Sequence, residues 1–477
     1  MSLSSAISTA QQIFSNTAQQ TSVLSKNIAN ANNSDYARRM ATLSTSAHGA
    51  EVVTIQRAQN DALLKQKIIS NAQSTGQDTL MTGLDEIRIA LGGNDYTSAP
   101  SSYLSKFRDS LQTLASTPSS RTTAASTVAA AGDLAKSLNT AADKLQDMRR
   151  VADADIADSV AKLNSLLSDF EIANHSVQGA LSAGADAGDA LDQRDKLLSQ
   201  MSEIIGISTV TRKDNDMVIY TSDGTVLFEN KPRQVTFQQT NGFDAGTTGA
   251  AIYVDGIAVK GGQGANTTAQ GKLPALLQLR DDVLPTFQTQ LDEVARGLVE
   301  VFKEGSGQGL FKANSVVFGS VSNSSVATAI KGYANTISVN PAAVANPLLV
   351  RDGGFNGVVS NTTGSSGYTT LIDSFVTALG AKMAFDPAAG LTANTSLLSF
   401  STESVGWLEQ MRSTASSAND NKSALLTRTQ ESLSNLTGVN MNEELSLMLD
   451  LEQSYKASAK LLTTVDAMMT SLLDAVR

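Results

Sequence analysis

A heptad pattern of apolar residues near the C-terminal end most strongly constrains how this chain can fold. From Met441 onward, apolar residues recur every seven positions, and a second, interrupted apolar row interleaves with them. Spacings of three and four place both rows on one side of an α-helix, as in a coiled coil. Charged residues interrupt the segment too often for a membrane span. The pattern predicts an assembly helix whose interface residues are Met441, Leu445, Met448, Tyr455, Leu462, Met469, Leu472 and Val476.

A weaker stripe of the same kind lies at the opposite end of the chain. Over the first 28 residues, apolar or small side chains alternate at spacings of three and four. Chain termini are usually the least ordered parts of a domain. Heptads at both ends therefore indicate that the chain brings its ends together or lends them to neighbouring subunits, with the two helices unpaired before assembly. The expected interface residues here are Leu3, Ile7, Phe14, Leu24 and Ile28.

The charge balance and the residue types exclude several classes of function. Thirty-six basic residues against 46 acidic residues give a net charge of −10, with no basic block. Nucleic acid and anionic membrane surfaces are therefore not expected partners. The chain has no cysteine, which excludes disulfides and thiolate chemistry. Its first residues contain no basic and apolar signal regions, so we expect no cleaved signal peptide.

An asparagine-rich segment ends the predicted first helix. Four asparagines within seven residues favour a helix stop and a turn, because their side chains compete for backbone hydrogen bonds. With the helix before it, the segment resembles the N-terminal signature of bacterial flagellar axial proteins. These proteins commonly have glycine before the tyrosine, where this chain has Asp35. The residues that carry the resemblance are Asn27, Ile28, Asn30, Asn32, Tyr36 and Arg38.

The hydrophobic period predicts a mainly α fold: a long helical bundle or coiled coil built from both chain termini. A small inserted antiparallel β domain and a second irregular or β segment interrupt it, because the period changes there and glycine, serine and asparagine become frequent. The expected domains are 1–60 (amphipathic helix and polar loop), 61–205 (first half of a helical rod), 206–272 (β domain), 273–304 (long rod helix), 305–368 (irregular or β), 369–437 (second half of the rod) and 438–477 (assembly helix).

Further motifs make the resemblance specific to one family. A Leu-Asp-Gln-Arg-Asp block precedes the β insert, and an Asn-Met-Asn-Glu-Glu block opens the C-terminal helix. With the blocks between them, their order resembles the FlgK family of hook-associated proteins, which form the hook–filament junction of the bacterial flagellum. The matching family residues are Leu191, Asp192, Arg194, Asp195, Asn440, Glu443 and Glu444.

The resemblance implies a structural role outside the cell. Such subunits leave through the flagellar type III export apparatus and assemble at the distal end of the hook, by folding and packing of the terminal helices. The implied partners are further copies of the chain in a ring or tube, the hook protein below and the next hook-associated junction protein above. An export chaperone would bind the C-terminal helix.

No residue pattern in the sequence supports an enzyme, a cofactor site or a metal site. The two histidines, His48 and His175, occur in unrelated contexts without a nucleophile motif. The aspartates at positions 153, 155 and 158 lack the glycine and glutamate of a calcium loop, so a solvated helix face is expected. Alternative functions are another flagellar axial protein (a second junction protein or a hook subunit), a secreted adhesin or a secreted enzyme.

Overall fold

The computed structural model describes residues 3–46, 49–305, 307–313 and 330–476. The chain forms two units. The first unit contains residues 1–74, 162–235 and 422–477, and the second contains residues 75–161 and 236–421. Three long helices contribute residues to both units: α2 (Asp61–Ala90), α4 (Arg121–Ser182) and α12 (Leu397–Thr437). The fold is mainly helical with several small antiparallel sheets, which confirms the predicted class.

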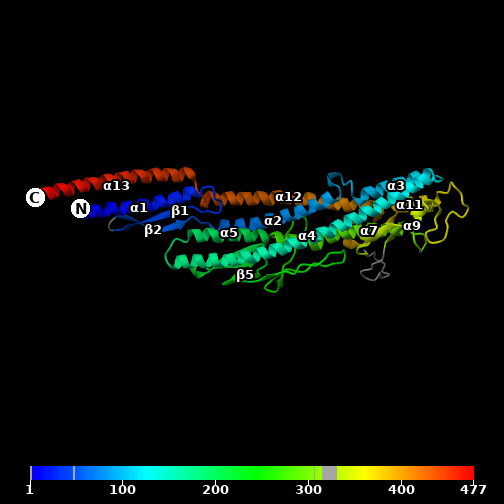
Figure 1. Cartoon of the computed structure of the whole chain (residues 1–477), viewed down its shortest axis with the longest axis horizontal. Helices are drawn as coiled ribbons and strands as arrows, with labels where there is room; N and C mark the ends of the chain where they lie inside the picture. Colours follow the sequence, from blue (N-terminus) through cyan, green and yellow to red (C-terminus); the bar gives the residue numbers. More distant parts are fainter. Residues whose placement is uncertain (1–2, 47–48, 306, 314–329, 477) are drawn as a thin grey trace. The chain divides into compact units, whose positions relative to one another are not determined.

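The first unit contains both ends of the chain (Figure 1). The N-terminal helix lies between the C-terminal helix and a β-hairpin (Figure 1). The unit also contains a four-stranded antiparallel sheet in the order β3-β4-β5-β6. Its elements are α1 (Leu3–Ala29), β1 (Arg39–Ser46), β2 (Gly49–Arg57), α5 (Gly188–Ile204), β3 (Ile207–Thr211), β4 (Met217–Thr221), β5 (Val226–Glu229), β6 (Lys231–Pro232) and α13 (Met441–Val476).

The hairpin β1–β2 follows the predicted polar loop, which spans residues 30–38 between α1 and β1. Apolar and polar residues alternate over positions 50–56 and indicate a strand, but the sequence of its partner strand β1 shows no clear alternation of this kind. The pairing of β1 with β2 shifts register between Thr42 and Leu43, which breaks the period of two. Met40 and Leu43 are also exposed, so burial does not sort the side chains of β1 into two faces.

The second unit has a core of aromatic and aliphatic side chains. The ring of Phe302 lies 5.2 Å from that of Phe107, 5.4 Å from Phe311 and 4.8 Å from Phe375. The elements of this unit are α3 (Pro100–Ser116), β8 (Tyr253–Val254), β9 (Ile257–Ala258), α6 (Lys272–Gln278), α7 (Leu284–Val301), β10 (Phe311–Ala313), α8 (Tyr333–Thr336), β11 (Ile337–Val339), α9 (Pro341–Ala345), α10 (Leu349–Asp352), α11 (Thr370–Gly380), β12 (Lys382–Ala384) and β13 (Asn394–Ser396). A further strand, β7 (Val235–Thr236), contributes Val235 to the first unit and Thr236 to the second.

The predicted rod helix of 273–304 is two helices joined by a π-helical turn. The turn spans Leu279–Val283, between α6 and α7. Pro285 stands in the first turn of α7 and has no backbone N–H to continue the regular hydrogen-bond ladder. A π-turn accommodates such an interruption without ending the helix.

Two buried arginines hold the irregular backbone that leads to β8. Arg149 donates hydrogen bonds to the carbonyl oxygens of Asp244 (3.2 Å) and Thr247 (2.6 Å). Arg280 donates to the carbonyl oxygen of Ala250 at 2.7 Å. Irregular backbone lacks partners within its own strand or helix, so side chains must satisfy its carbonyl groups. These two guanidinium groups take that role.

The second unit also corrects the expectation for the aspartates of α4. Asp153 is fully buried, pairs with the Arg280 guanidinium and accepts a hydrogen bond from the Thr240 N–H at 2.8 Å. Asp155 is half-buried beside Lys272, and Asp158 is exposed. A solvated helix face therefore describes Asp158 alone, because Arg280 approaches Asp153 from a distant part of the chain.

The glycine-rich segment of 305–368 contains more structure than its composition predicts. Strand β10 pairs with β11 in antiparallel fashion, and the short helices α8, α9 and α10 follow. Residues 306 and 314–329 of this predicted segment lie outside the described residues. Asn340 caps α9 by accepting a hydrogen bond from the Ala342 N–H at 3.1 Å. Caps of this kind stabilise helices too short to be recognised by hydrophobic period.

Asp292 of α7 holds the first turn of α8. Its carboxylate accepts hydrogen bonds of 2.9 Å from the backbone N–H groups of Gly332 and Ala334 and from the side chain of Gln288. The side chain is only 1% exposed. Burial raises the pKa of Asp292 from its ordinary value of 3.8 to about 7, against the effect of these donors.

This raised pKa predicts a pH-dependent stability. Between about pH 4 and 7 the folded protein binds a proton at Asp292 that the unfolded chain does not. The free energy of unfolding should therefore fall as pH rises through this window, by at most about 1.4 kcal/mol per pH unit from this group. Asp292→Asn should remove that part of the slope in urea unfolding at a series of pH values, and the exposed Asp373→Asn should retain it. An unchanged slope in Asp292→Asn would contradict the assignment.

Candidate functional site

The asparagine-rich turn after α1 returns the chain toward the helix it has just left. Asn30 donates a hydrogen bond to the Lys26 carbonyl oxygen at 3.0 Å, and Asn33 donates to the Asn30 side-chain oxygen at 3.3 Å. Asn33 in turn accepts from the Asp35 N–H at 3.1 Å. Asp35 does not adopt a positive φ, and its carboxylate lies 3.2 Å from Lys196. These local bonds close the turn and place Tyr36 beside α1.

Asn27 is the centre of a buried polar cluster. Its amide nitrogen donates hydrogen bonds of 2.9 Å to the Arg39 carbonyl oxygen and to Oε2 of Glu444. Its amide oxygen accepts bonds from the Tyr36 hydroxyl (2.8 Å) and from the Arg39 N–H (2.9 Å). The side chain is 0% exposed. An amide has two N–H donors and two acceptor positions, so Asn27 uses its complete capacity here.

The first turn of α13 carries the partner of Asn27. Asn440 caps this helix by accepting from the Asn442 N–H at 3.1 Å. Arg38 donates from Nε to Oε1 of Glu444 at 2.6 Å and lies 3.4 Å from Glu443. The Arg38 N–H also donates to the Thr437 carbonyl oxygen at 2.7 Å. The start of α13 is thus fixed to the segment that follows α1.

One face of α5 presents three carboxylates to two arginines. Asp189, Asp192 and Asp195 are spaced by three residues, so they lie on the same side of the helix. Arg39 pairs with Asp189 and Asp192. Arg57, the last residue of β2, lies 2.8 Å from Asp192 and 2.6 Å from Asp195. The hairpin is therefore attached to α5 at its open end.

Burial and charge shape the protonation of this cluster. Burial raises the pKa of Tyr36 to about 12, so its hydroxyl remains a hydrogen-bond donor to Asn27. Burial also raises the pKa of Asp195, against the opposing effect of Arg57. Breaking one partner out of a buried ion pair typically costs about 3–5 kcal/mol, whereas replacing the pair with apolar residues is often neutral. The cluster is therefore better suited to specifying geometry than to adding stability.

The structure brings together most of the predicted family residues. Asn27, Tyr36, Arg38, Glu443 and Glu444 meet in the cluster, and Asn440 caps the helix beside it, as described above. The motif also predicted Asp192 and Asp195, which lie on the adjoining face of α5.

Four predicted family residues have other surroundings, and Asn30 serves only the local turn. Arg194 is buried but donates instead to the side chain of Asn174 (3.3 Å) and the carbonyl oxygen of Asn215 (2.9 Å). Ile28 and Leu191 are half-buried, and Asn32 is exposed.

Three members of the cluster were not predicted: Arg39, Arg57 and Asp189. The spacing of three between Asp189, Asp192 and Asp195 could have indicated an acidic helix face. Nothing local to Arg39 or Arg57 identifies a partner, because the acids lie more than 130 positions away. Only the folded chain pairs these charges.

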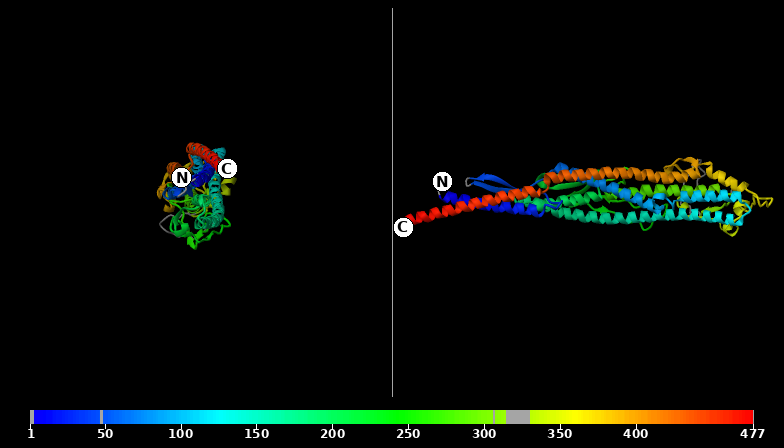
Figure 2. Two further views of the ribbon diagram at one scale, coloured as in Figure 1. Left: turned by 90° about the vertical axis from the view of Figure 1, so that its left-hand side faces the viewer. Right: turned by 90° about the horizontal axis from the view of Figure 1, so that it is seen from above.

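The two terminal helices pack against each other in antiparallel fashion (Figures 1 and 2). The rings of Phe14 and Tyr455 meet edge to face with 4.9 Å between their centres. This confirms the predicted alternative in which the chain brings its ends together, and it corrects the expectation that the two helices are unpaired before assembly. The α13 residues at helical spacing along this side, all buried or half-buried except Tyr455, are Glu444, Met448, Leu451, Tyr455, Ser458, Leu462 and Val465.

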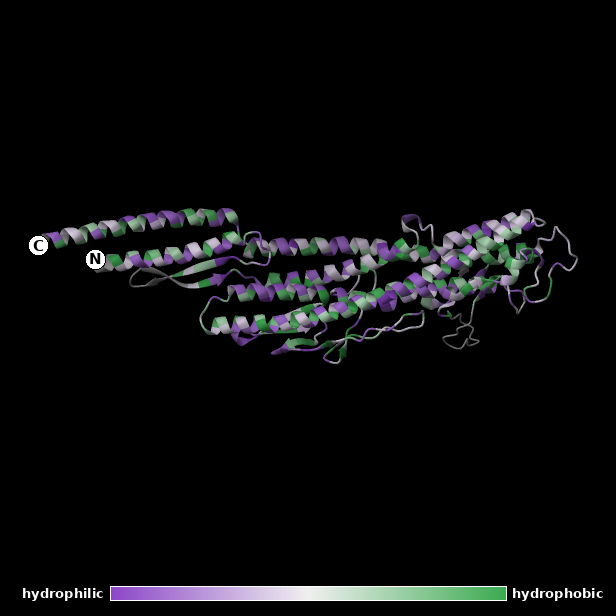
Figure 3. Ribbon diagram, viewed as in Figure 1, coloured by the Kyte–Doolittle hydropathy of each residue, from purple (hydrophilic) through white to green (hydrophobic). Residues whose placement is uncertain are grey.

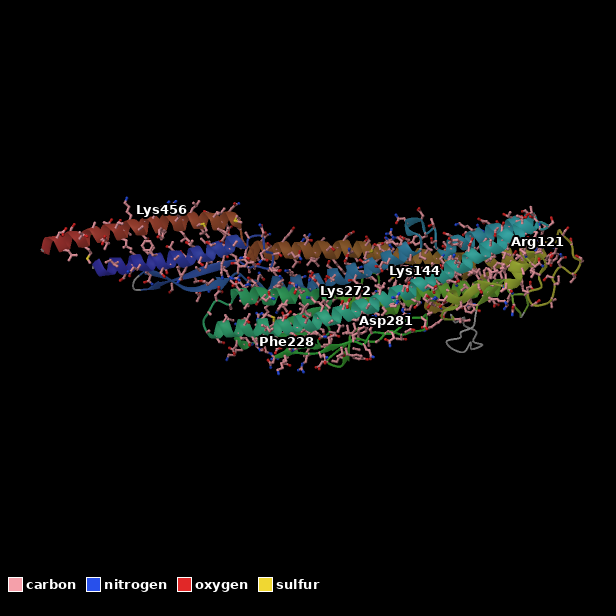
Figure 4. All side chains as sticks on the ribbon, viewed as in Figure 1. Arg121, Lys144, Phe228, Lys272, Asp281 and Lys456 are labelled. Atoms are coloured by element: carbon pink, nitrogen blue, oxygen red, sulfur yellow. The ribbon has the colours of Figure 1, made fainter. Side chains whose placement is uncertain are left out.

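A second set of apolar side chains on α13 remains exposed. Figure 3 shows apolar and polar residues alternating along this helix, and the labelled Lys456 in Figure 4 has an exposed side chain. The predicted interface residues Met441, Leu445, Tyr455 and Met469 belong to this exposed set, while the side chains of Leu3, Leu472 and Val476 lie outside the described ones. The exposed large apolar residues of α13 are Met441, Leu445, Leu447, Leu449, Tyr455, Leu461, Met468, Met469 and Leu473.

A surface pocket of about 310 Å³ adjoins the polar cluster. Its lining mixes basic side chains such as Lys65 and Arg57 with acidic ones such as Asp61 and Asp195. The described lining contains no histidine, and its charges are of both signs. The pocket therefore provides hydrogen-bonding and ionic groups without an arrangement for nucleophilic catalysis.

Metal and membrane sites find no support in the described part of the chain. Among the described residues, no three histidine, aspartate or glutamate side chains are grouped to hold a metal ion. None of the described helices is long and apolar enough to cross a membrane. His175 is exposed on α4, and His48 lies outside the described residues.

Two segments of the chain match models of known protein families. Residues 93–316 match the helical domain of the flagellar hook-associated protein FlgK. Residues 431–475, which include the end of α12 and nearly all of α13, match the C-terminal region of the flagellar basal body rod FlgEFG protein.

Curated relatives extend the similarity. Flagellar hook-associated protein 1 of Salmonella typhimurium is 25% identical over 292 residues, covering 58% of this chain and 52% of the relative. The same-named protein of Bacillus subtilis is 21% identical over 511 residues, covering 98% of both. The chain thus spans about half the length of the Salmonella protein and nearly all of the Bacillus one. The solved hook junction protein FlgK of Burkholderia pseudomallei aligns with a TM-score of 0.43 and 20% identity, covering 52% of this chain and 47% of that protein.

The hydrogen bonds of Asn27 predict that replacing it with the isosteric aspartate strongly destabilises the protein. Asn27→Asp removes both donors and places a second carboxylate against Glu444, so it should destabilise the first unit by about 3 kcal/mol or more. Asn32→Asp makes the same chemical change at an exposed position of the same motif and should shift stability by less than about 0.5 kcal/mol. Urea unfolding of both variants measures the difference. Equal stability of the two variants would show that Asn27 does not hold the cluster together.

Proposed function

We propose, from the membership of this chain in the flagellar hook-associated protein 1 family, that it is a structural subunit of the bacterial flagellum. It assembles at the distal end of the hook and forms the hook–filament junction. Both the family-model matches and the named relatives support this role. The protein would act outside the cell after type III export, and it supports motility as a building block and not as an enzyme.

The observation that carries this proposal is that α13 has two apolar sides, one paired with α1 and one exposed. One side of this helix lies against α1, and the other side keeps large apolar residues in water, such as Leu461 at 59% exposure. An exposed apolar row at helical spacing is typical of a surface that another protein covers. In a tube, one face of a subunit meets a different face of the next copy. The exposed side of α13 is suited to such a contact.

Assembly would then add contacts to a pair of helices that already exists. The α1–α13 pair forms within one chain, and burial of the exposed row by neighbouring copies stabilises it further, because binding to the folded form shifts the folding equilibrium. The segments 1–60 and 438–477 form the assembly core in this proposal. The segments 61–205, 273–304 and 369–437 supply helical support, and 206–272 and 305–368 are insertions.

The proposed partners follow from the same role. Further copies of this chain lie beside it in the ring or tube, with the hook protein below and the next hook-associated junction protein above. An export chaperone would cover the apolar residues of the C-terminal helix before assembly. Another flagellar axial role is the second candidate, because residues 431–475 also match the rod-protein model.

Three exposed apolar residues of α13 provide a direct test. Leu447→Ser, Leu461→Ser and Met468→Ser combined should change monomer stability by little, since exposed substitutions usually stay within about 0.5 kcal/mol each. The combined variant, expressed in a strain lacking the native gene, should nevertheless give hooks without filaments in electron micrographs. Secretion into the medium should be measured separately, because loss of chaperone binding would reduce export first.

The control carries the same kind of change elsewhere on the surface. Ile89→Ser with Val344→Ser removes two exposed apolar side chains from the second unit. This control variant should restore filaments to the deletion strain. Normal filaments with the α13 variant would contradict the proposal that its exposed row is a junction contact. A deletion strain that still forms filaments would contradict the junction role itself.

A further inference from the structure

The interface between α1 and α13 contains one buried polar pair among apolar and small residues. Glu444 and Asn27 are both 0% exposed and are joined by a hydrogen bond of 2.9 Å. Among the described α13 side chains at the same helical spacing, Glu444 is the charged one. The others are Met448, Leu451, Tyr455, Ser458, Leu462 and Val465.

The apolar residues of this interface cannot by themselves fix how the helices align. Met448, Tyr455 and Leu462 follow each other at intervals of seven. A shift of one heptad therefore places one large apolar side chain where another had been, and a mismatch of size costs less than a buried charge without its partner. Several registers of the two helices therefore remain open.

Glu444 distinguishes the observed register from these alternatives. A shift of one heptad brings Leu451 to the position of Glu444, so the Asn27 amide and the Arg38 Nε both lose their acceptor. Buried donors without acceptors, and a carboxylate removed from its cation, are strongly unfavourable. A single polar residue in an apolar seam is an established way to specify register in coiled coils.

We propose that Glu444 is a specificity-determining residue, which makes α13 pair with α1 in one register. The short connection between α12 and α13, residues 438–440, also limits how far α13 can slide along α1. Arg38 also holds the end of α12 through its bond to the Thr437 carbonyl oxygen. Slippage would require the first turns of α13 to unwind. This role is independent of the proposed junction function, because it concerns pairing within one chain.

Engineered cysteines can report the register, because the chain has no cysteine of its own. The pair Phe14→Cys with Tyr455→Cys marks the observed register, since these two rings touch. The pair Phe14→Cys with Leu462→Cys marks a shift of one heptad. Each pair is treated with a short bis-thiol crosslinker in otherwise native protein.

With Glu444 present, the 14–455 pair should crosslink about tenfold faster than the 14–462 pair. Glu444→Leu should bring the two rates within about threefold of each other. Glu444→Gln keeps the size of the side chain and should give intermediate values. Glu443→Leu makes the same change at the exposed neighbouring residue and should leave the tenfold preference intact.

Two outcomes would overturn the proposal. An unchanged preference for the 14–455 pair in Glu444→Leu would show that the apolar contacts or the connection to α12 set the register. Loss of both crosslinks in Glu444→Leu, with Glu444→Gln behaving alike, would show that Glu444 supplies the stability of the pair and not its selection.

Discussion

The four hydrogen bonds of the buried Asn27 amide join segments that are more than 400 positions apart in the chain. The amide binds the backbone of Arg39 on one side and the carboxylate of Glu444 on the other. These bonds fix where α1 ends, where β1 begins and where α13 starts. An aspartate cannot donate these bonds, and a longer amide displaces them, so the position requires asparagine. Both terminal helices depend on this one side chain for their attachment.

Arginine side chains complete the architecture in both units, through different partners. In the first unit, Arg39 and Arg57 attach the hairpin to a row of carboxylates on α5. In the second unit, Arg149 and Arg280 bind carbonyl groups of backbone that has no regular partner. Buried ion pairs add little net stability, but they reject arrangements that leave a charge unpaired. The fold therefore uses charge to define geometry, while apolar burial supplies the driving force.

The C-terminal helix α13 has apolar residues on two sides, and apolar contacts alone do not decide which side pairs with α1. It pairs with α1 along one side, and its other side carries exposed apolar residues. A helix with apolar residues on more than one side can pair in several ways. In our proposals, the buried carboxylate of Glu444 restricts the inner side to one register, and the outer side is the surface that neighbouring copies cover.

The sequence by itself determined the mainly helical class, the two amphipathic ends and the family motifs, because hydrophobic period and short polar motifs are local signals. Only the tertiary structure decided that Arg39 and Arg57 meet the carboxylates of α5, that Asp153 is buried and that β1 pairs with β2. Charged partners come together from distant segments and leave no period in the sequence. A strand with exposed apolar residues and a shifted register likewise has no alternation to reveal it.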